Sequence, residues 1–540
     1  MATVAVTLFL LLAVVLSEFV SRLLRFAIPR PLIQIGLGAV MGLSSQLVVA
    51  LDPQIFFLLF LPPLLFLDGW RIPPEELFKD RSTVIQLALG LVVFTVLGIG
   101  LFIHWLMPAM PLPVAFALAA VLSPTDPIAV SAIAQRAPMS RRMVYVLEGE
   151  SLLNDASGLV CFRFAVAAML TGAFSLSAAL LDFAWIAVGG IAVGVALTRV
   201  LCWLKSVVSE HLGEDSGSQI LISLLIPFGC YLMAEELNCS GILAAVAAGL
   251  TMSFVESSGS AMAVTRIRRN TVWDVIQFTA NGVIFVLLGE QLHGIVSGAS
   301  ATVLLTGHSH PAWLVAYVVA ITGGLAALRF VWVLVSLRLG GMRSSASPGN
   351  WRLVAVMSLA GVRGAVTLAG VLSLPLALPG GAPFPARDLA VLLAMGVILL
   401  SLVAASIGLP LLLKGLAAPA DPSFEAEEAR ARVAAAHAAI AAIERLEKQR
   451  SDAQPDADIA IDAAARVIGI YRARIDSQSG NAEGDALLRR GDVIERGMRL
   501  AGIRAERNDI FRELRARKLG SETARKLIRE LDLLEARHLG

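Results

Sequence analysis

The chain has 540 residues, of which 57% are hydrophobic and only 16% are charged, and its mean hydropathy is +0.75. A soluble domain carries about 25% charged residues, so the composition excludes an ordinary soluble protein and indicates a membrane protein. The net charge of +2 gives no indication of a nucleic-acid partner.

The charged residues are unevenly distributed along the chain. About half of them follow position 420, so a weakly charged block, residues 1–415, precedes a highly charged tail, residues 416–540. The tail mixes Ala, Leu, Arg and Glu at helical spacing, which predicts a small helical domain. The sequence shows no nucleotide-binding loop or catalytic triad, and its four cysteines are scattered. We therefore expect no enzyme activity and no cofactor.

Thirteen predominantly apolar segments lie in the first block. A helix needs about 20 such residues to cross the hydrocarbon core of a bilayer, so the sequence predicts an all-α polytopic membrane protein. The segments lie near residues 2–20, 31–49, 54–69, 82–107, 112–135, 143–170, 178–203, 218–236, 239–256, 271–292, 311–337, 352–376 and 388–413.

Basic residues indicate the orientation, because they favour the cytoplasmic side of a membrane. They follow the odd-numbered segments, with Arg22 after the first, Arg71 after the third and Arg136 after the fifth, whereas the even-numbered turns hold only Arg387. One missed or additional helix would destroy this alternation. We therefore predict an external N-terminus, a cytoplasmic tail and a location in the plasma (inner) membrane.

Three ionisable residues are predicted to lie near the middle of the bilayer. A helix rises 1.5 Å per residue, so half of a ~30 Å core corresponds to about ten residues. Asp126, Asp155 and Arg363 each lie about ten to twelve residues from the cytoplasmic end of their segment, the fifth, sixth and twelfth. Charges at this depth are costly, so we expect them to form an ion or proton site.

Two of these segments contain helix breakers. The fifth contains Ser-Pro-Thr-Asp-Pro at 123–127, and the twelfth contains Gly-Val-Arg-Gly at 361–364. Proline removes a backbone donor, and paired glycines allow an unwound turn. Broken helices at corresponding places in two halves are typical of a transport site between inverted repeats. The two segments are seven apart, and this odd offset reverses their direction, as inversion requires.

The sixth segment carries most of the polar residues. Ser151 and Asp155 are four residues apart and share one helix face. Glu148 lies a further turn inward on that face, where it would line a cytoplasmic funnel. Asn154 cannot ionise and is expected to bond the broken backbone of the fifth segment.

The remaining buried charges need partners of their own. Glu150 is rotated away from Asp155, and Arg363 is the obvious candidate to pair with it, because an unpaired buried carboxylate is too costly. Arg163 is expected near the outer interface, where its long side chain reaches water. Arg329 lies deeper and could pair with an acid or a lipid, and the sequence does not assign it.

These motifs carry a family resemblance. Thr125-Asp126-Pro127, the run Glu150-Ser151-x-x-Asn154-Asp155 and the Gly-x-Arg-Gly of 361–364 resemble the monovalent cation–proton antiporters. The chain is most similar to the sodium/proton exchanger branch, which has Asn-Asp where the electrogenic branch has Asp-Asp. Further matches are Phe-Leu-Pro-Pro-Leu-Leu-Phe at 60–66 and Ser-Gly-Ile-Leu-Ala at 240–244, so the resemblance covers roughly residues 1–415.

The resemblance implies a thirteen-helix fold with two inverted repeats crossing at broken helices, and a homodimer. It implies that Asp155 carries the cation or proton, with Ser151 and Thr125 as Na⁺ ligands and Asn154 and Asp126 beside them. It also implies a structural ion pair between Glu150 and Arg363. Many relatives place a glutamate directly after the Pro-Pro run of the third segment, whereas here Leu67 precedes Asp68. This departure weighs against a water-mediated role for Asp68.

Charge counting then predicts the mechanism. Asp155 holds either one proton or, when ionised, one monovalent cation, so alternating access would exchange the two without net charge movement. We predict Na⁺/H⁺ exchange for intracellular pH and Na⁺ homeostasis, with Li⁺ or K⁺ as alternative cations. A K⁺/H⁺ antiporter, a gated monovalent cation channel and a proton-coupled carrier of organic solutes remain open as alternatives.

Overall fold

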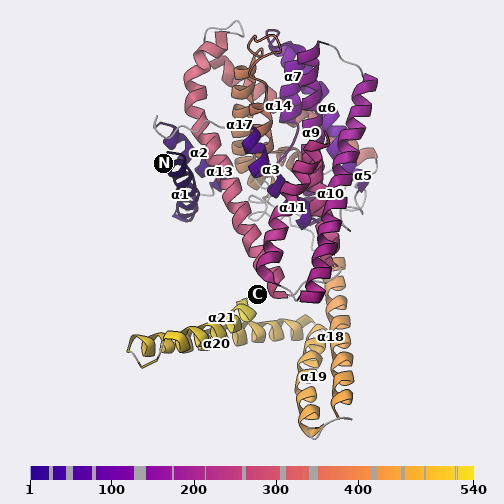
Figure 1. Cartoon of the computed structure of the whole chain (residues 1–540), viewed down its shortest axis with the longest axis vertical. Coiled ribbons are helices and arrows are strands. Elements are labelled where there is room, and N and C mark those ends of the chain that lie inside the picture. Colours follow the sequence, from indigo (N-terminus) through magenta and orange to yellow (C-terminus); the bar gives the residue numbers. More distant parts are fainter. Residues whose placement is uncertain are drawn as a thin grey trace. The chain divides into compact units, whose positions relative to one another are not determined.

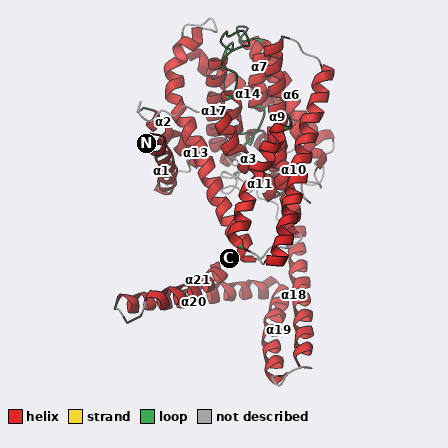
Figure 2. Ribbon diagram, viewed as in Figure 1, coloured by secondary structure: helices red, strands yellow, loops and turns green. Residues whose placement is uncertain are grey.

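The computed structural model consists of helices and loops in the part of the chain that it describes (Figure 2), and the all-α prediction is confirmed. The chain divides into two compact units, Met1–Ala418 and Pro419–Gly540. The described residues are 2–23, 28–43, 53–73, 75, 81–126, 141–172, 176–212, 215–257, 263–304, 310, 312–339, 351–414, 422–451, 457–479, 482–516, 518–519 and 521–539.

The first unit contains the apolar helices, which pack alongside one another (Figure 1). Eight helices among the described residues are long and apolar enough to cross a bilayer, so the count of thirteen spans stays a prediction. The helices are α1 (Ala2–Leu23), α2 (Arg30–Gly42), α3 (Pro53–Arg71), α5 (Arg81–Ile85) with the π-helical η1 (Gln86–Gly90) and α6 (Leu91–Leu106), α7 (Leu112–Leu122), α9 (Arg141–Thr171), α10 (Leu176–Leu212), α11 (Ser216–Glu236), α12 (Gly241–Ser257), α13 (Ala263–Leu304), α14 (Ala312–Leu339), α15 (Trp351–Leu359), α16 (Ala365–Leu372) and α17 (Arg387–Leu413).

Both predicted helix breaks are present. Helix α7 ends at Leu122, and residues 123–126 are not helical. The twelfth predicted segment is divided into α15 and α16 by the non-helical residues 360–364. The second proline of the first break, Pro127, lies outside the described residues. In the described residues, α7 and α15 therefore each end where the sequence supplies Pro or Gly.

Helix contacts reveal the internal repeat. The pair α1–α2 corresponds to α11–α12, the pair α2–α13 to α12–α3, and the pair α6–α7 to α14–α15, each time at an offset of seven predicted segments. The contacts α7–α9 and α16–α17 correspond in the same way, and α7–α16 corresponds to itself. This correspondence supports the inverted repeat, with α10 between the two halves.

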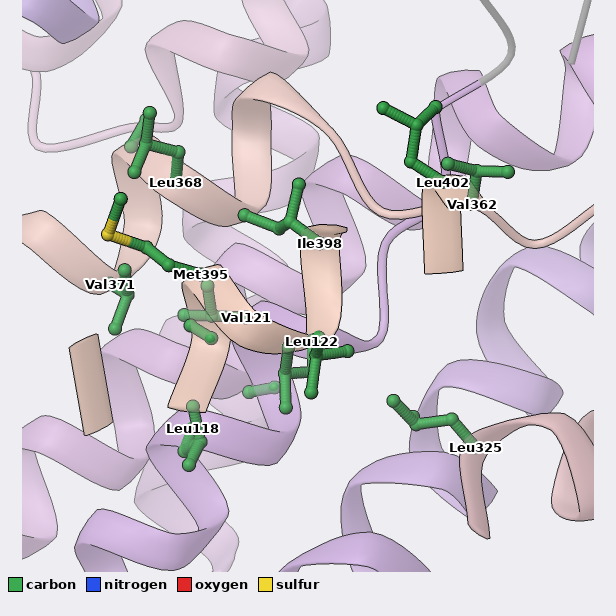
Figure 3. Close-up of a cluster of buried hydrophobic side chains, with 14 of the residues drawn as sticks. Leu118, Val121, Leu122, Leu325, Val362, Leu368, Val371, Met395, Ile398 and Leu402 are labelled. Carbon is green, nitrogen blue, oxygen red and sulfur yellow. The ribbon is translucent and has the colours of Figure 1, made fainter. Parts of the chain in front are cut away.

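The helices form two groups. Helices α1, α2, α3, α11, α12 and α13 contact one another, as do α6, α7, α9, α14, α15, α16 and α17. We call these the first and the second helix group. A buried apolar cluster fixes the broken helices within the second group (Figure 3). It includes Leu118, Val121 and Leu122 of α7, Val362 of the second break, Leu368 and Val371 of α16, and Met395, Ile398 and Leu402 of α17.

Glycines allow the closest approaches in the first helix group. A Cβ on Gly38 of α2 would lie 1.9 Å from the carbonyl oxygen of Val286, and one on Gly289 of α13 would lie 2.0 Å from that of Ile35. The equivalent pair α3–α12 is packed equally closely, because a Cβ on Gly249 of α12 would lie 2.1 Å from the carbonyl oxygen of Phe66. Small residues at helix interfaces are the usual device for close packing in membranes.

The second unit is helical, as predicted for the tail. Helix α18 (Pro422–Ser451) packs on α19 (Ala457–Ser479), and α20 (Ala482–Arg515) packs on α21 (Ser521–Leu539). Arg507 of α20 bonds Glu535 of α21, and its Nη2 lies 2.8 Å from Asp532 Oδ1. Ionic contacts therefore contribute to the pairing of α20 with α21.

We predict that Gly38→Ala lowers the unfolding free energy by about 1–3 kcal/mol, because the added methyl group overpacks the α2–α13 contact. The measurement is thermal unfolding in detergent. Gly36→Ala is the matched control, because a Cβ at this position of the same helix meets no atom within 4 Å. Equal melting temperatures for the two variants would show that α2 and α13 are not in close contact at Gly38.

Candidate functional site

The two helix breaks cross and bond each other. The backbone N–H of Asp126 in the first break donates to the carbonyl oxygen of Val362 in the second, at 2.7 Å. Nη1 of Arg363 donates to the carbonyl oxygens of Ser123 at 2.9 Å and Pro124 at 3.1 Å. Carbonyl groups that follow the last turn of a helix lack helical partners. The Arg363 guanidinium therefore satisfies carbonyls just beyond the negatively polarised end of α7.

Asp126 of the first break lies at the N-terminus of α16, which follows the second break. Gly364 is the N-cap residue of this helix, and a Cβ on it would lie 1.9 Å from Asp126 Oδ2. Only glycine lets the carboxylate approach the start of α16 this closely. A carboxylate is favourable at a helix N-terminus, as a cation is at a C-terminus. The negative charge of Asp126 thus offsets the positive partial charge at the N-terminus of α16. The positive charge of Arg363 offsets the negative partial charge at the C-terminus of α7.

Helix α9 holds the first break in place. The Ser151 hydroxyl donates to the carbonyl oxygen of Thr125, and Asn154 Nδ2 donates to Thr125 Oγ1 at 2.9 Å. The expected contact of Asn154 with the backbone is therefore wrong in detail, because Ser151 takes the carbonyl and Asn154 takes the side chain. On the neighbouring face, Ser157 donates to the carbonyl oxygen of Ala88 in the π-helical turn η1, at 2.6 Å.

A cavity of about 40 Å³ lies where the two helix groups meet. A cavity needs about 10–15 Å³ to hold one water molecule, so this cavity holds only a few particles of that size. Three carboxylate residues, Asp68, Asp126 and Asp155, come together in its wall. Its lining residues are Leu61, Leu64, Leu65, Asp68, Pro124, Thr125, Asp126, Asp155, Asn281, Gly364, Val366 and Thr367.

Only some of the residues predicted for the site line the cavity. Thr125, Asp126 and Asp155 line it, and all three are buried. Ser151 and Asn154 are also buried but are not among its lining residues, and both bond Thr125, which is. Their predicted role as direct ligands stays a prediction. The half-buried Glu148 does not line the cavity either, and its role in a funnel is untested.

The predicted ion pair between Glu150 and Arg363 is wrong. Glu150 bonds Arg329 of α14 through both carboxylate oxygens, with 2.7 Å between Nη2 and Oε2, and both residues are buried. The Nε of Arg329 also donates to the carbonyl oxygen of Met357 at 2.9 Å. Arg363 is directed to the carbonyls of the first break instead. A two-pronged guanidinium matches a carboxylate and leaves neither buried charge unpaired.

Sequence reasoning missed three lining residues. The sequence weighs against a role for Asp68, because Leu67 stands where many relatives have a glutamate, yet Asp68 lines the cavity. Asn281 of α13 and Thr367 of α16 were not considered as ligands. An amide inside an otherwise apolar segment and a hydroxyl four residues after Arg363 were the signals that would have found them.

Comparisons with known proteins show the family to which the chain is similar. Residues 7–415 match the model of the sodium/hydrogen exchanger transmembrane family. An uncharacterized Na⁺/H⁺ exchanger of Escherichia coli K12, YjcE, is 40% identical over 536 residues, which cover 97% of each chain. A sodium, potassium, lithium and rubidium/H⁺ antiporter of Bacillus pumilus is 44% identical over 411 residues, which cover 75% of this chain and 60% of that protein.

The fold is also similar to a solved structure. The sodium proton antiporter MjNhaP1 from Methanocaldococcus jannaschii matches with a TM-score of 0.59 at 20% sequence identity. The match covers 77% of this chain and 99% of that one. The two proteins therefore share a fold.

We predict that Glu150→Gln lowers the unfolding free energy by about 3–5 kcal/mol, because it leaves the Arg329 charge buried without a counter-ion. The double variant Glu150→Gln/Arg329→Gln should recover part of this loss. The measurement is a double-mutant cycle by thermal or chemical unfolding in detergent.

The control for this cycle is Arg163→Gln. Arg163 pairs with Glu235 at 3.1 Å on an exposed surface, with side-chain exposures of 49% and 34%. Such pairs contribute about 0–1 kcal/mol. A coupling energy between Glu150 and Arg363 that exceeds the one between Glu150 and Arg329 would contradict the observed pair and support the ion pair expected from the sequence.

Proposed function

The chain belongs to the sodium/hydrogen exchanger family, whose members are membrane transporters and not enzymes, and we propose that it exchanges a monovalent cation for protons by alternating access. Asp155 is the carboxylate that binds either the cation or the proton in this proposal. Thr125 and Asp126 of the first break bind beside it. Ser151 and Asn154 support them by holding Thr125.

The grouping of three carboxylates in one small cavity carries this proposal. Carboxylates that share a site repel one another, so each favours protonation of its neighbours or the binding of a cation. The cavity that Asp68, Asp126 and Asp155 line has room for a small ion. A proton and a monovalent cation then compete for the same negative charge, which is the requirement for coupled exchange.

The size of the cavity argues against an organic substrate. Pockets for drug-sized ligands have volumes of about 300–1,000 Å³, whereas this cavity has about 40 Å³. A carrier of organic solutes would need a much larger space between the helix groups. An alkali cation needs only a few oxygen ligands at short distance, and the lining residues supply them.

The position of the cavity between the helix groups supports alternating access. Asp68 and Asn281 belong to the first group, whereas Thr125, Asp155 and Thr367 belong to the second. A rocking movement of one group against the other exposes such a site to each side of the membrane in turn. A gated channel would instead need one continuous path, and it would conduct current.

The relatives guide the choice of cation. We propose Na⁺ as the main substrate, with Li⁺ or K⁺ as alternatives, because the Escherichia coli relative is named a Na⁺/H⁺ exchanger. The Bacillus pumilus relative is named an antiporter for sodium, potassium, lithium and rubidium. The protein would act in the plasma membrane as a homodimer, with its tail in the cytoplasm, in pH and Na⁺ homeostasis.

We predict that Asp155→Asn abolishes exchange while the protein stays folded, because the neutral amide takes up no proton and removes the negative charge for which proton and cation compete. The measurement is internal pH of proteoliposomes after addition of each alkali cation. Asp388→Asn is the matched control, because its carboxylate is 84% exposed at the start of α17. Coupled flux that persists in Asp155→Asn would remove this residue from the mechanism.

We also predict electroneutral exchange of one cation for one proton. Asn154 stands beside Asp155 where a second titrating carboxylate would be needed, and Arg329 pairs with Glu150. Moving one net charge through the membrane field is worth about 2.3 kcal/mol per 100 mV. The test sets the potential of proteoliposomes with a potassium ionophore during sodium-driven proton flux. A rate that follows the imposed voltage would show that Asp68 or Asp126 carries an additional proton.

A further inference from the structure

The hydroxyl group of Thr367 is unusual within the cavity wall. The residue is 1% exposed, it lines the cavity, and its Oγ1 has no hydrogen-bond partner among the described residues. A buried hydroxyl without a partner is destabilising. Its position is therefore better explained by a ligand than by packing alone.

The broken helix explains why this hydroxyl has no partner. A threonine within a helix usually donates to the carbonyl oxygen four residues earlier. Thr251 of α12 does so to Ala247 and Thr322 of α14 does so to Val318, both at 2.7 Å. Thr367 lies in the first turn of α16, and the residue four positions earlier is Arg363, which lies in the break. The carbonyl four positions earlier is therefore not placed by a helical turn.

Asn281 offers a second neutral oxygen from the opposite wall. It belongs to α13 of the first helix group, is half-buried and lines the same cavity. The two side chains differ from the three aspartates because they carry no charge. Carboxylates attract every alkali cation, whereas the number and spacing of neutral oxygens discriminate between cations of different size.

We propose that Thr367 is a specificity-determining ligand of the transported cation, and that its hydroxyl oxygen completes the coordination together with the carboxamide oxygen of Asn281. This inference rests on the proposed cation/proton exchange. Thr367 belongs to the group that carries Asp155, and Asn281 belongs to the other. The cation is therefore coordinated from both groups, and the fit between them sets which cation is preferred.

The test is transport in proteoliposomes with Na⁺, Li⁺ and K⁺ for the full chain and for Thr367→Val, which keeps the shape of the side chain and removes the hydroxyl. We expect the KM for the preferred cation to rise about five- to tenfold, as for the loss of one hydrogen-bonding ligand. The ratio of KM values between cations should change, while kcat at saturating cation stays nearly constant. Thr367→Ser should restore the original ratio.

Thr251→Val is the matched control, because this buried threonine bonds its own helix and does not line the cavity. Unchanged KM ratios in Thr367→Val, or a loss of kcat alone, would overturn the inference. If Thr367→Val does not fold, Asn281→Ala decides, because an unchanged ratio there also overturns it. A wild-type chain without any cation/proton exchange would instead refute the proposed function.

Discussion

Every backbone polar group inside a bilayer must find a partner within the protein, and this constraint shapes the site. Two broken helices would leave donors and acceptors exposed to hydrocarbon. Here each break satisfies the other, with Asp126 N–H bonded to Val362 and Arg363 bonded to the carbonyls of Ser123 and Pro124. The crossing therefore has to form as one unit. Non-helical backbone is tolerated there because it is buried in the protein, and the cavity lies beside it.

The buried charges fall into two classes. Glu150 of α9 and Arg329 of α14 bond each other directly and both are buried, which is the arrangement of a structural ion pair. Asp155 is buried in the same helix as Glu150 but lines the cavity. Five residues along a helix turn the side chain by about 140° from its starting direction. One helix thus carries a paired carboxylate, Glu150, and the proposed transport carboxylate, Asp155, on different faces.

Sequence reasoning predicted the layer of the charges better than their partners. Hydropathy, breakers and the rise per residue placed Asp126, Asp155 and Arg363 at one depth, and the structure brings them to one crossing. Depth does not give the direction in which a side chain points across the bilayer plane. The predicted depth of Arg329 and of Arg363 allows either side chain to reach Glu150. The structure shows that Arg329 of α14 is the partner. The same limit applies to Asp68, because one residue along a helix changes its direction by about 100°.

The division of the cavity wall between the helix groups links binding to movement. Asp68 and Asn281 stand on the first group, and Asp155 and Thr367 stand on the second. Any displacement of the groups changes the distances between these oxygens, so a cation that bridges both walls stabilises one arrangement over others. A proton on Asp155 needs no such bridge. In the proposed exchange, this difference between a bound cation and a bound proton would provide a physical basis for releasing the two on opposite sides of the membrane.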